Sequence, residues 1–550
     1  PDNRFVVQCR FSSLMRKFQK DPSYFEEYKE AIEKYIHAGH AERVPDDDEI
    51  ETEKGRCNYL PHHAVEHTRK ALRIVYDTSL KTHGKSVSTE TYSGPDLLQS
   101  LIGVFIRFRL HSVAIMGDIS QFYHSVGIPK EDYDFYRFLW LQDGDLESKI
   151  VVFRLLVHIF GGIASQSCCS FALLRSIDDA VSDEILTAEQ ARRLKRSLYS
   201  DDYLSSFENV EQAIKTVLKT IDVFQENNFV LTKFVSNHPE FLEAIPVDRR
   251  APDVKDAIIT DKVGTALGMK WIYNEDHIIF RYSISNDVIK TKRQLLSAIA
   301  RIYDPANLIS FAIIPAKLIL QNAFRRGLDW EDPLPDDLEK EIIKWTENLR
   351  RLENLKIPRP YHAFSKSPII SRQLHVFNDA SEVCYASACF VRNLHKDGMV
   401  TCSLVAAKNR LAPLRTKVTI PRLELNGCRL GAQLLHLVRK EIDVSIESIP
   451  CWTDSVASLS FIRNTNTRFS VYVGHRINEV QTLTKIEDWR YLPTKMNVAD
   501  GLSRGEFPNE LDQHPYYRGP SFLYEEPSSW PTEPPNVRQS KPEPDEIRTQ

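Results

Sequence analysis

The stretch "SLYSDDYLSS", residues 197–206, places two adjacent aspartates between two short β-forming runs. A Leu-Tyr pair precedes Asp201 and a Tyr-Leu pair follows Asp202, so the sequence predicts a hairpin with both carboxylates at its tip. Most Asp-Asp pairs in this setting are solvated turns. A functional site requires a third carboxylate at the same point, because crowded acidic groups repel one another unless divalent cations lie among them.

A candidate for the third carboxylate ends an earlier apolar run. In "SVAIMGDISQFYHSV", residues 112–126, a strand-like segment ends at Asp118 and a helix-like segment follows. A carboxylate at a strand end and a later Asp-Asp hairpin form the layout that a two-metal phosphoryl-transfer site requires. Two Mg²⁺ ions roughly 3.5–4 Å apart need hard oxygen ligands from separate strands.

The chain of 550 residues is too long for one hydrophobic core, and three or four domains are expected. Its 42% hydrophobic and 27% charged residues are typical of soluble globular proteins. We find no apolar run of about 18 residues and no signal-peptide pattern at the start, so neither a membrane span nor secretion is predicted. The first residue is Pro1 rather than Met, which suggests a piece of a longer protein.

The nine cysteines are scattered without C-x-x-C spacing, which predicts reduced thiols in a cytosolic or nuclear setting. "CNYLPHH", residues 57–63, is expected to be structural. The net charge of −4 argues against a nucleic-acid binder. However, the last 45 residues carry nine acids and four bases, so they contribute −5 and the rest carries +1. Two basic strips, 67–73 and 191–196, are candidate parts of a basic groove, although solvated surfaces are commoner.

Periodicity predicts a helix over 10–38, alternating strands and helices over 57–235, and a helix near 209–227. "TKRQLLSAIARIYDP" predicts a helix that Thr291 caps with Gln294 and that Pro305 stops. Strands, a helix and another strand follow over 366–505. The expected domains are an N-terminal helical segment leading into fingers (1–56), fingers and palm (57–235), a primer-grip, thumb and connection region (236–365), a ribonuclease H-like domain (366–505) and a Pro-rich linker or tail (506–550).

Ordered motifs run along the chain: "LRIVYDTS", "DISQFYHSV", "FGGIASQS", "YSDD" and "ALGMKW", then "TKRQLLSAIARIYDPANLIS" and "LILQNAFRRGLDWEDPLP". They resemble the motifs of a reverse transcriptase, most closely the BEL/Pao class of long-terminal-repeat retrotransposons. "FNDASEVCYAS", "TIPRLELNGCRLGAQL", "CWTDS" and "RYLPTKMNVADGLSRG" resemble the ribonuclease H domain of that class. The similarity spans nearly residues 1–530. It implies an α+β multidomain fold, with a right-hand polymerase followed by a ribonuclease H-like α/β domain.

The resemblance implies roles for residues of the polymerase region. Asp118 and Asp201 match the main metal ligands, with Asp202 beside them and the carbonyl of Ile119 as a further oxygen. Arg73 matches the arginine that grips the incoming triphosphate, with Lys70 or Arg69 as possible helpers. The remaining expected contacts to nucleotide or primer are Tyr123 under the sugar, Phe160 and Gly161 beside the nucleotide, and Leu267, Gly268 and Met269 in the strand that holds the primer end.

The sequence departs from the pattern of retroviral enzymes at two positions and varies at a third. Phe160 stands where many of them have a polar glutamine that contacts the nucleotide. Gln166 replaces a proline that is common in this segment, and Ser200 fills the variable position of the Tyr-x-Asp-Asp box. The first two differences predict altered nucleotide handling. By composition alone, Tyr123 is a core aromatic.

The resemblance implies a second two-metal site at four carboxylates: Asp379, Glu424, Asp454 and Asp500. In a ribonuclease H, this set binds two Mg²⁺ ions, or Mn²⁺ in their place, that activate water against an RNA phosphodiester. RNA paired with DNA is the expected substrate, because the 2′-hydroxyl distinguishes the strands. A glutamate within a helix is usually exposed and has no functional role. Only the series of four motifs favours Glu424 as a metal ligand.

The function implied is RNA- and DNA-templated DNA synthesis with degradation of the RNA strand of hybrids, in retrotransposon replication. Expected partners are an RNA template, a DNA primer, RNA/DNA hybrid, deoxynucleoside triphosphates and the flanking protease and integrase of one Pol polyprotein, with no membrane. The expected location is cytoplasmic virus-like particles, with access to the nucleus. Two alternatives stay open: an inactive domesticated remnant that binds nucleic acid, and a two-metal nuclease without polymerase activity.

Overall fold

The computed structural model describes residues 3–45, 57–67, 70–254, 263–280, 289–414, 416, 418–505, 507, 514–538, 541–542 and 544–547. The chain forms two compact units. The first comprises residues 1–99, 117–203 and 215–233, and the second comprises 100–116, 204–214 and 234–550. The domain boundaries expected from the sequence stay predictions. Among the described residues, no helix is long and apolar enough to cross a membrane.

The chain begins with two helices, α1 (Arg4–Lys20) and α2 (Pro22–His37), where the periodicity predicted one helix over 10–38. The prediction of one helix is wrong because the chain turns at Asp21. The Asp21 side chain accepts a hydrogen bond from the Tyr24 amide, and Pro22 takes the first helical position, where its missing N–H costs nothing.

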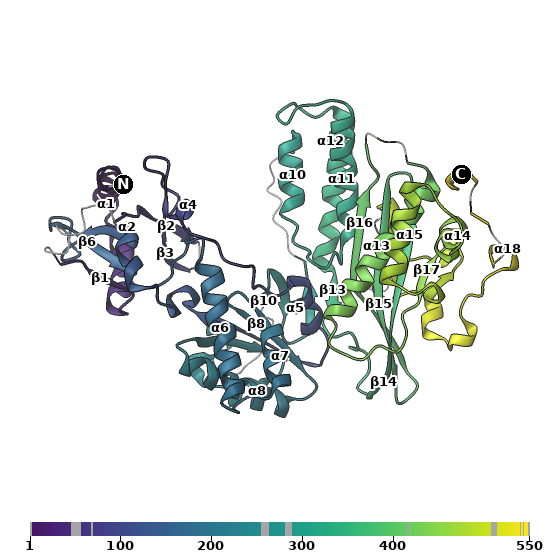
Figure 1. The fold of residues 1–550 in the computed structure, drawn as a ribbon, viewed down its shortest axis with the longest axis horizontal. Helices are drawn as coiled ribbons and strands as arrows, with labels where there is room; N and C mark the ends of the chain where they lie inside the picture. The colour runs from purple at the N-terminus through teal and green to yellow at the C-terminus, as the bar shows by residue number, and fades with distance from the viewer. Residues whose placement is uncertain are drawn as a thin grey trace. The chain divides into compact units, whose positions relative to one another are not determined.

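The core of the first unit is an aromatic cluster. Helices α1 and α2 pack on it with the sheet β1-β6-β5 (Ala41–Arg43, Ile150–Leu155, Arg137–Leu141) and the hairpin β2-β3 (His62–His67, Lys70–Tyr76) (Figure 1). The buried His62 accepts from the Tyr28 hydroxyl at 2.6 Å and donates to the Leu139 carbonyl at 2.9 Å. Burial lowers the pKa of His62 to about 4, so the ring is neutral and structural, as expected for "CNYLPHH".

A four-stranded sheet has the order β7-β8-β4-β9, formed by Leu198–Tyr199, Asp202–Phe207, Val113–Ser120 and Val230–Ser236. The predicted hairpin is confirmed, because Leu198 pairs with Tyr203 and Tyr199 pairs with Asp202. Ser200 turns the chain with a φ of 55°. The helices of this region are α4 (Val87–Glu90), α6 (Ser165–Ser182), α7 (Ala188–Arg196) and α8 (Val210–Glu226), the last within the range predicted.

In the second unit, α5 (Leu101–Phe108) and α9 (Pro239–Ala244) accompany the sheet β10-β11-β12-β13, formed by Val263–Ala266, Met269–Ile272, His277–Ile279 and Lys356–Pro358. Leu267 and Gly268 were expected in a strand, and this expectation is wrong, because they form the two-residue turn between β10 and β11. Their φ angles of 48° and 81° suit such a turn. Met269 is the first residue of β11.

Three helices follow side by side: α10 (Lys292–Ala300), α11 (Ser310–Arg325) and α12 (Asp336–Arg350) (Figure 1). The predicted cap of α10 is confirmed. The Thr291 side chain accepts from the Gln294 amide while the Gln294 side chain accepts from the Thr291 amide. This reciprocal pair satisfies two backbone donors that the helix itself leaves free.

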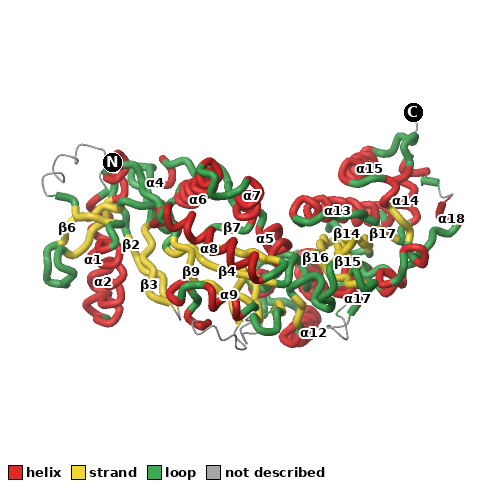
Figure 2. The backbone as a smooth tube through the Cα atoms, turned by 90° about the horizontal axis from the view of Figure 1, so that it is seen from below, coloured by secondary structure: helices red, strands yellow, loops and turns green. Residues whose placement is uncertain are grey.

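The last sheet has the order β16-β15-β14-β17-β18. Strands β14 (Ile369–Ala380), β15 (Cys384–His395) and β16 (Val400–Leu411) are antiparallel, whereas β17 (Cys451–Thr453) and β18 (Trp489–Tyr491) run parallel to β14. Helix α13 (Ile420–Glu441) packs on this sheet (Figure 2). Further helices are α14 (Val456–Arg463), α15 (Val471–Leu483) and α16 (Asp500–Arg504).

Residues 514–538 are not the linker or tail that their prolines predicted. They contain the short helices α17 (Pro515–Arg518) and α18 (Pro535–Arg538), and Phe522 and Trp530 are buried. The ring of Trp452 in β17 lies 5.1 Å from that of Phe522 and 6.1 Å from that of Trp530. The large aromatic side chains between the prolines bury enough apolar surface to hold this segment on the sheet.

Candidate functional site

The first candidate site lies in the first unit, where strand β4 meets the β7–β8 turn. The Ile119 amide donates to the Asp201 carbonyl at 2.7 Å, which holds the end of β4 against the turn. Both Asp118 and Asp201 are half-buried. Burial, and then repulsion from Asp118, raises the pKa of Asp201. The predicted pair of carboxylates is therefore brought together, and Asp202 follows as the first residue of β8.

Lys233 of strand β9 forms an ion pair with the Asp118 carboxylate. The side chain of Lys233 is 56% exposed and that of Asp118 is 26% exposed. Sequence reasoning missed this lysine. The only local signal is a single cation in the mostly apolar run "FVLTKFV".

Arg73, Tyr123 and Phe160 gather beside this carboxylate pair. The guanidinium of Arg73 lies over the Phe160 ring at 4.4 Å, and the Tyr123 ring meets Phe160 edge-on with centroids 4.9 Å apart. Arg73 is also close enough to lower the pKa of Asp201, after the larger effects of burial and neighbouring groups. Phe160 therefore takes a cation–π contact where a glutamine would offer an amide.

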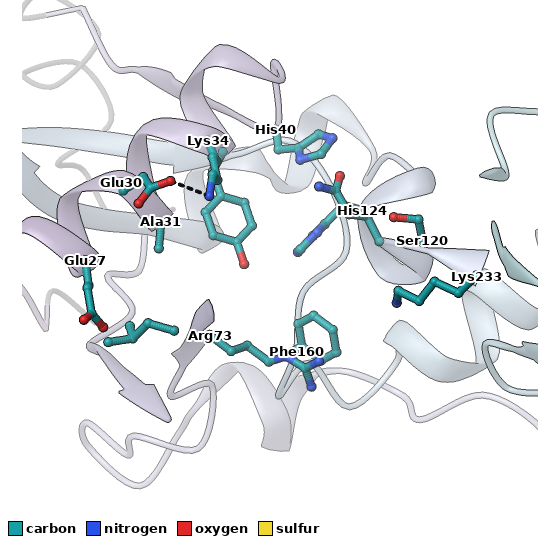
Figure 3. A pocket seen from close by; sticks show the side chains of 13 residues that line it. Glu27, Glu30, Ala31, Lys34, His40, Arg73, Ser120, His124, Phe160 and Lys233 are labelled. Carbon is teal, nitrogen blue, oxygen red and sulfur yellow. Dashed lines mark ion pairs between the residues drawn. The ribbon is translucent and has the colours of Figure 1, made fainter. Parts of the chain in front are cut away.

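A cavity of about 540 Å³ opens between Arg73, Phe160 and helix α2 (Figure 3). Its lining includes cationic side chains from three elements, namely Lys34 of α2, Arg73 of β3 and Lys233 of β9. Lys34 is paired with Glu30 at 2.8 Å. Glu27 and Glu30 of α2 also line the cavity, so its charge is mixed. A concave cavity with these cations next to two carboxylates can accept an anionic ligand that also carries divalent cations.

Gly161, next to Phe160, lies close to strand β3. Its φ is 96°, and a Cβ at this position would lie 2.8 Å from the Tyr76 carbonyl oxygen. Only glycine combines this φ with such a close approach to strand β3. The segment that carries Phe160 therefore lies directly against the strand that carries Arg73.

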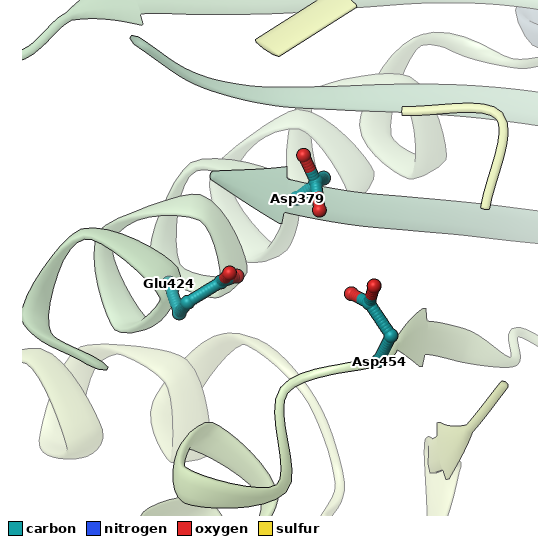
Figure 4. Close-up of side chains that lie close together, drawn as sticks. All are labelled: Asp379, Glu424 and Asp454. Atoms are coloured by element: carbon teal, nitrogen blue, oxygen red, sulfur yellow. The ribbon is translucent and has the colours of Figure 1, made fainter. Parts of the chain in front are cut away.

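The second candidate site lies in the second unit and contains Asp379 of β14, Glu424 of α13 and Asp454, which follows β17 (Figure 4). One carboxylate oxygen from each residue lies within 4.8 Å of the others. Strand β17 runs parallel to β14 beside it, so Asp379 and Asp454 leave the sheet at the same edge. The close approach of α13 to β14 depends on Gly427, where a Cβ would lie 2.9 Å from the Asp379 carbonyl oxygen.

The electrostatics of this cluster favour a bound cation. Burial, followed by repulsion from Asp379 and Asp454, raises the pKa of Glu424 to about 9. Burial also raises the pKa of Asp379 to about 7. The Oε2 atom of Glu424 is buried and has no hydrogen-bond partner. Oxygen ligands, mutual repulsion and an orphaned carboxylate oxygen are what a divalent cation such as Mg²⁺ compensates, so the residues present fit this metal.

Asp500, the fourth predicted carboxylate, lies at the start of α16 and accepts from Arg504 at 2.9 Å. It is close enough to raise the pKa of Asp379 slightly but does not share the 4.8 Å cluster. Two further residues support the site and were not predicted. The Ser503 hydroxyl donates to Asp379 at 2.5 Å, and the Asn497 amide donates to Asp454 at 3.2 Å.

Comparison with protein families identifies relatives of the second unit. Residues 291–455 match the Pao retrotransposon-like RNaseH-like domain. The expected resemblance to Pao retrotransposons is confirmed over this Pao RNaseH-like segment, which contains all three residues of the acidic cluster. A search of curated proteins gave no match to the chain.

Among solved structures, the chain is similar to a foamy viral protease-reverse transcriptase dRH in complex with double-stranded DNA, at 13% identity and a TM-score of 0.51. The match covers 84% of this chain and 69% of that chain. A foamy viral protease-reverse transcriptase in complex with RNA/DNA hybrid matches at 13% identity and a TM-score of 0.48, over 85% of this chain and 54% of that chain. The expected α+β multidomain fold is confirmed as that of a reverse transcriptase.

Proposed function

We propose that the chain synthesises DNA on RNA and DNA templates and degrades the RNA strand of RNA/DNA hybrids during retrotransposon replication. The observation that carries the proposal is the partly buried cluster of Asp379, Glu424 and Asp454 inside the Pao RNaseH-like segment. Three carboxylates with an unpartnered oxygen destabilise a protein unless a cation binds them. A retained cluster of this kind indicates a metal-dependent site.

At the ribonuclease H site, Asp379, Glu424 and Asp454 would hold the metal, with Asp500 at the margin. When bound, Mg²⁺ supplies an activated water and neutralises charge on the phosphodiester. The Ser503 hydroxyl and the Asn497 amide hold Asp379 and Asp454 in place by donating to one oxygen of each. Glu424 is protonated at neutral pH without a metal, so it must release a proton when it becomes a ligand.

At the polymerase site, Asp118 and Asp201 would hold the metals, with Asp202 and the Ile119 carbonyl as further oxygens. Arg73 can bind the triphosphate through its planar donors, and the Phe160 ring under its guanidinium orients it. Tyr123 would lie beneath the sugar of the incoming nucleotide, with Gly161 beside it. Leu267, Gly268 and Met269 stay proposed contacts to the primer end.

The partners follow from this chemistry. They are an RNA template, a DNA primer, RNA/DNA hybrid and deoxynucleoside triphosphates, bound with two Mg²⁺ or Mn²⁺ ions at each site. A solved structure of similar fold contains double-stranded DNA, which supports a nucleic-acid duplex as a partner. We also propose that a protease and an integrase flank this chain in one polyprotein and that it acts in cytoplasmic virus-like particles with access to the nucleus.

Degradation of a hybrid with labelled RNA tests the proposal. The wild-type protein should degrade the RNA with Mg²⁺ and lose activity when EDTA is added. Glu424→Gln should lose more than the roughly 10- to 100-fold that an outer-shell change costs, because it removes a ligand charge. Glu382→Gln is the matched control, since Glu382 is exposed close to the end of β14. A wild-type protein without this activity, or full activity in Glu424→Gln, would contradict the proposal.

A further inference from the structure

Gln166, the second residue of helix α6, binds two hydroxyl groups that belong to distant parts of the first unit. Its Oε1 atom accepts from the Tyr123 hydroxyl at 2.9 Å and from the Ser200 hydroxyl at 2.9 Å. Its Nε2 atom donates to the Ser170 hydroxyl one helical turn later, also at 2.9 Å. Both polar atoms of the amide are therefore used.

Two contacts fix the Tyr123 side chain, one at its ring and one at its hydroxyl. The ring edge packs against Phe160, and the hydroxyl is tied to α6 through Gln166. Burial, followed by the charge of Asp201, raises the pKa of Tyr123, so its hydroxyl keeps the proton that it donates. An aromatic ring fixed at its hydroxyl cannot swing away without breaking a half-buried hydrogen bond.

The same amide also holds the tip of the Asp-Asp hairpin. Ser200 has a φ of 55° and directly precedes Asp201. One oxygen of Gln166 therefore links the Tyr123 ring to the turn that carries a proposed metal ligand. A change in Gln166 would loosen the ring relative to the point where a nucleotide phosphate must sit.

We propose that Gln166 is a positioning residue that fixes Tyr123 relative to the Asp201 turn and thereby sets the preference for deoxyribonucleotides over ribonucleotides. This inference rests on the proposed polymerase function and adds a specificity-determining residue to it. A ring that excludes the 2′-hydroxyl by collision must be rigid, because a mobile ring yields to the larger sugar.

The test is single-nucleotide incorporation with matched dNTP and rNTP, reporting kcat and KM for each. Gln166→Leu keeps the volume and removes all three hydrogen bonds of the amide. The dNTP-to-rNTP preference should fall by roughly tenfold, as expected for the loss of the bond to the Tyr123 hydroxyl. Gln166→Glu keeps an oxygen that accepts from both hydroxyls. Its added charge affects both nucleotides alike, so it should retain most of the preference. Gln212→Leu on the exposed face of α8 is the matched control and should equal wild type.

Tyr123→Phe removes the hydrogen bond between Tyr123 and Gln166 by removing its donor. This variant provides a second test if Gln166→Leu fails to fold. In the double variant, the effects of the two changes on the dNTP-to-rNTP preference should not add, because both break the hydrogen bond between Tyr123 and Gln166. A preference ratio that is unchanged in Gln166→Leu or in Tyr123→Phe, with dNTP still incorporated, overturns the positioning role alone. If the wild-type protein incorporates no nucleotide, the proposed function fails and this inference fails with it.

Discussion

Lys233 of strand β9 forms an ion pair with Asp118 of strand β4, so an ammonium group is paired with the carboxylate that we propose as a metal ligand. A cation that binds Asp118 competes with this ammonium for the negative charge of the carboxylate. Because the Lys233 side chain is mostly exposed, water and salt screen the pair, and it contributes no more than ~1 kcal/mol.

We therefore expect Lys233→Met to lower the Mg²⁺ concentration that half-saturates primer extension by about two- to fivefold, as this small energy allows. A Mg²⁺ titration of extension rate measures it, and Lys215→Met on α8 is the control. An unchanged or higher half-saturating concentration in Lys233→Met would show that the lysine does not compete with metal.

Tyr123→Ala should admit ribonucleotides far better while largely preserving deoxynucleotide use. With the ring present, a ribose must shift and misalign its phosphate by a fraction of an ångström, and such misplacement can cost on the order of 10²-fold in rate. Incorporation kinetics with matched dNTP and rNTP measure the preference. An unchanged dNTP-to-rNTP preference in Tyr123→Ala would mean that Tyr123 is only a core aromatic, as composition alone predicts.

The acidic cluster predicts how stability depends on pH. Burial raises the pKa of Glu424 to about 9 and that of Asp379 to about 7, above the values near 4 that unfolded carboxyl groups have. The unfolded state therefore loses these protons first, and the metal-free protein should lose stability as pH rises from about 4 to about 9. Thermal unfolding in EDTA at pH 5, 7 and 9 measures this trend.

Added Mg²⁺ should reverse the same trend, since it binds the ionised cluster. The gain in melting temperature on adding Mg²⁺ should be larger at pH 9 than at pH 5, and Glu424→Gln should reduce this difference. An equal gain at both pH values, or the same gain in Glu424→Gln, would argue against a metal at this cluster.

The second unit contains a buried ion pair between Arg107 of α5 and Glu441 at the end of α13, 2.5 Å apart and with both side chains about 10% exposed. Glu441→Ala leaves a buried guanidinium without its carboxylate, so it should cost about 3–5 kcal/mol of unfolding free energy. Chemical denaturation measures this loss. Breaking the exposed pair of Arg175 and Asp179 with Asp179→Ala should cost less than about 1 kcal/mol of unfolding free energy. An equal loss of unfolding free energy in both variants would contradict the larger contribution of the buried Arg107–Glu441 pair.

Local features were predictable because short stretches of sequence decide them. The Asp-Asp hairpin and the capping box at Thr291 formed where the sequence indicated. The single helix over 10–38 was wrong because a cap at Asp21 and the proline after it outweigh apolar periodicity. The expected strand at Leu267 and Gly268 became a turn because both residues adopt positive φ.

Contacts between distant segments could not be predicted in the same way. Ser503 and Asn497 reach the acidic cluster only through the fold, as Gln166 reaches Tyr123 and Ser200. Prolines in residues 506–550 indicated a linker, yet Phe522 and Trp530 find a partner in Trp452 of a distant strand. Neither local propensity nor composition encodes such pairings.

The most direct test is primer extension on a poly(rA) template with an oligo(dT) primer and Mg²⁺, comparing wild type, Asp201→Asn and Asp222→Asn. Asp222 is exposed on α8 and is the matched control. Wild type and Asp222→Asn should extend the primer, while Asp201→Asn should be slower by orders of magnitude, because removing a ligand charge weakens metal binding and transition-state stabilisation together. Wild-type-like extension by Asp201→Asn would contradict the two-metal polymerase site.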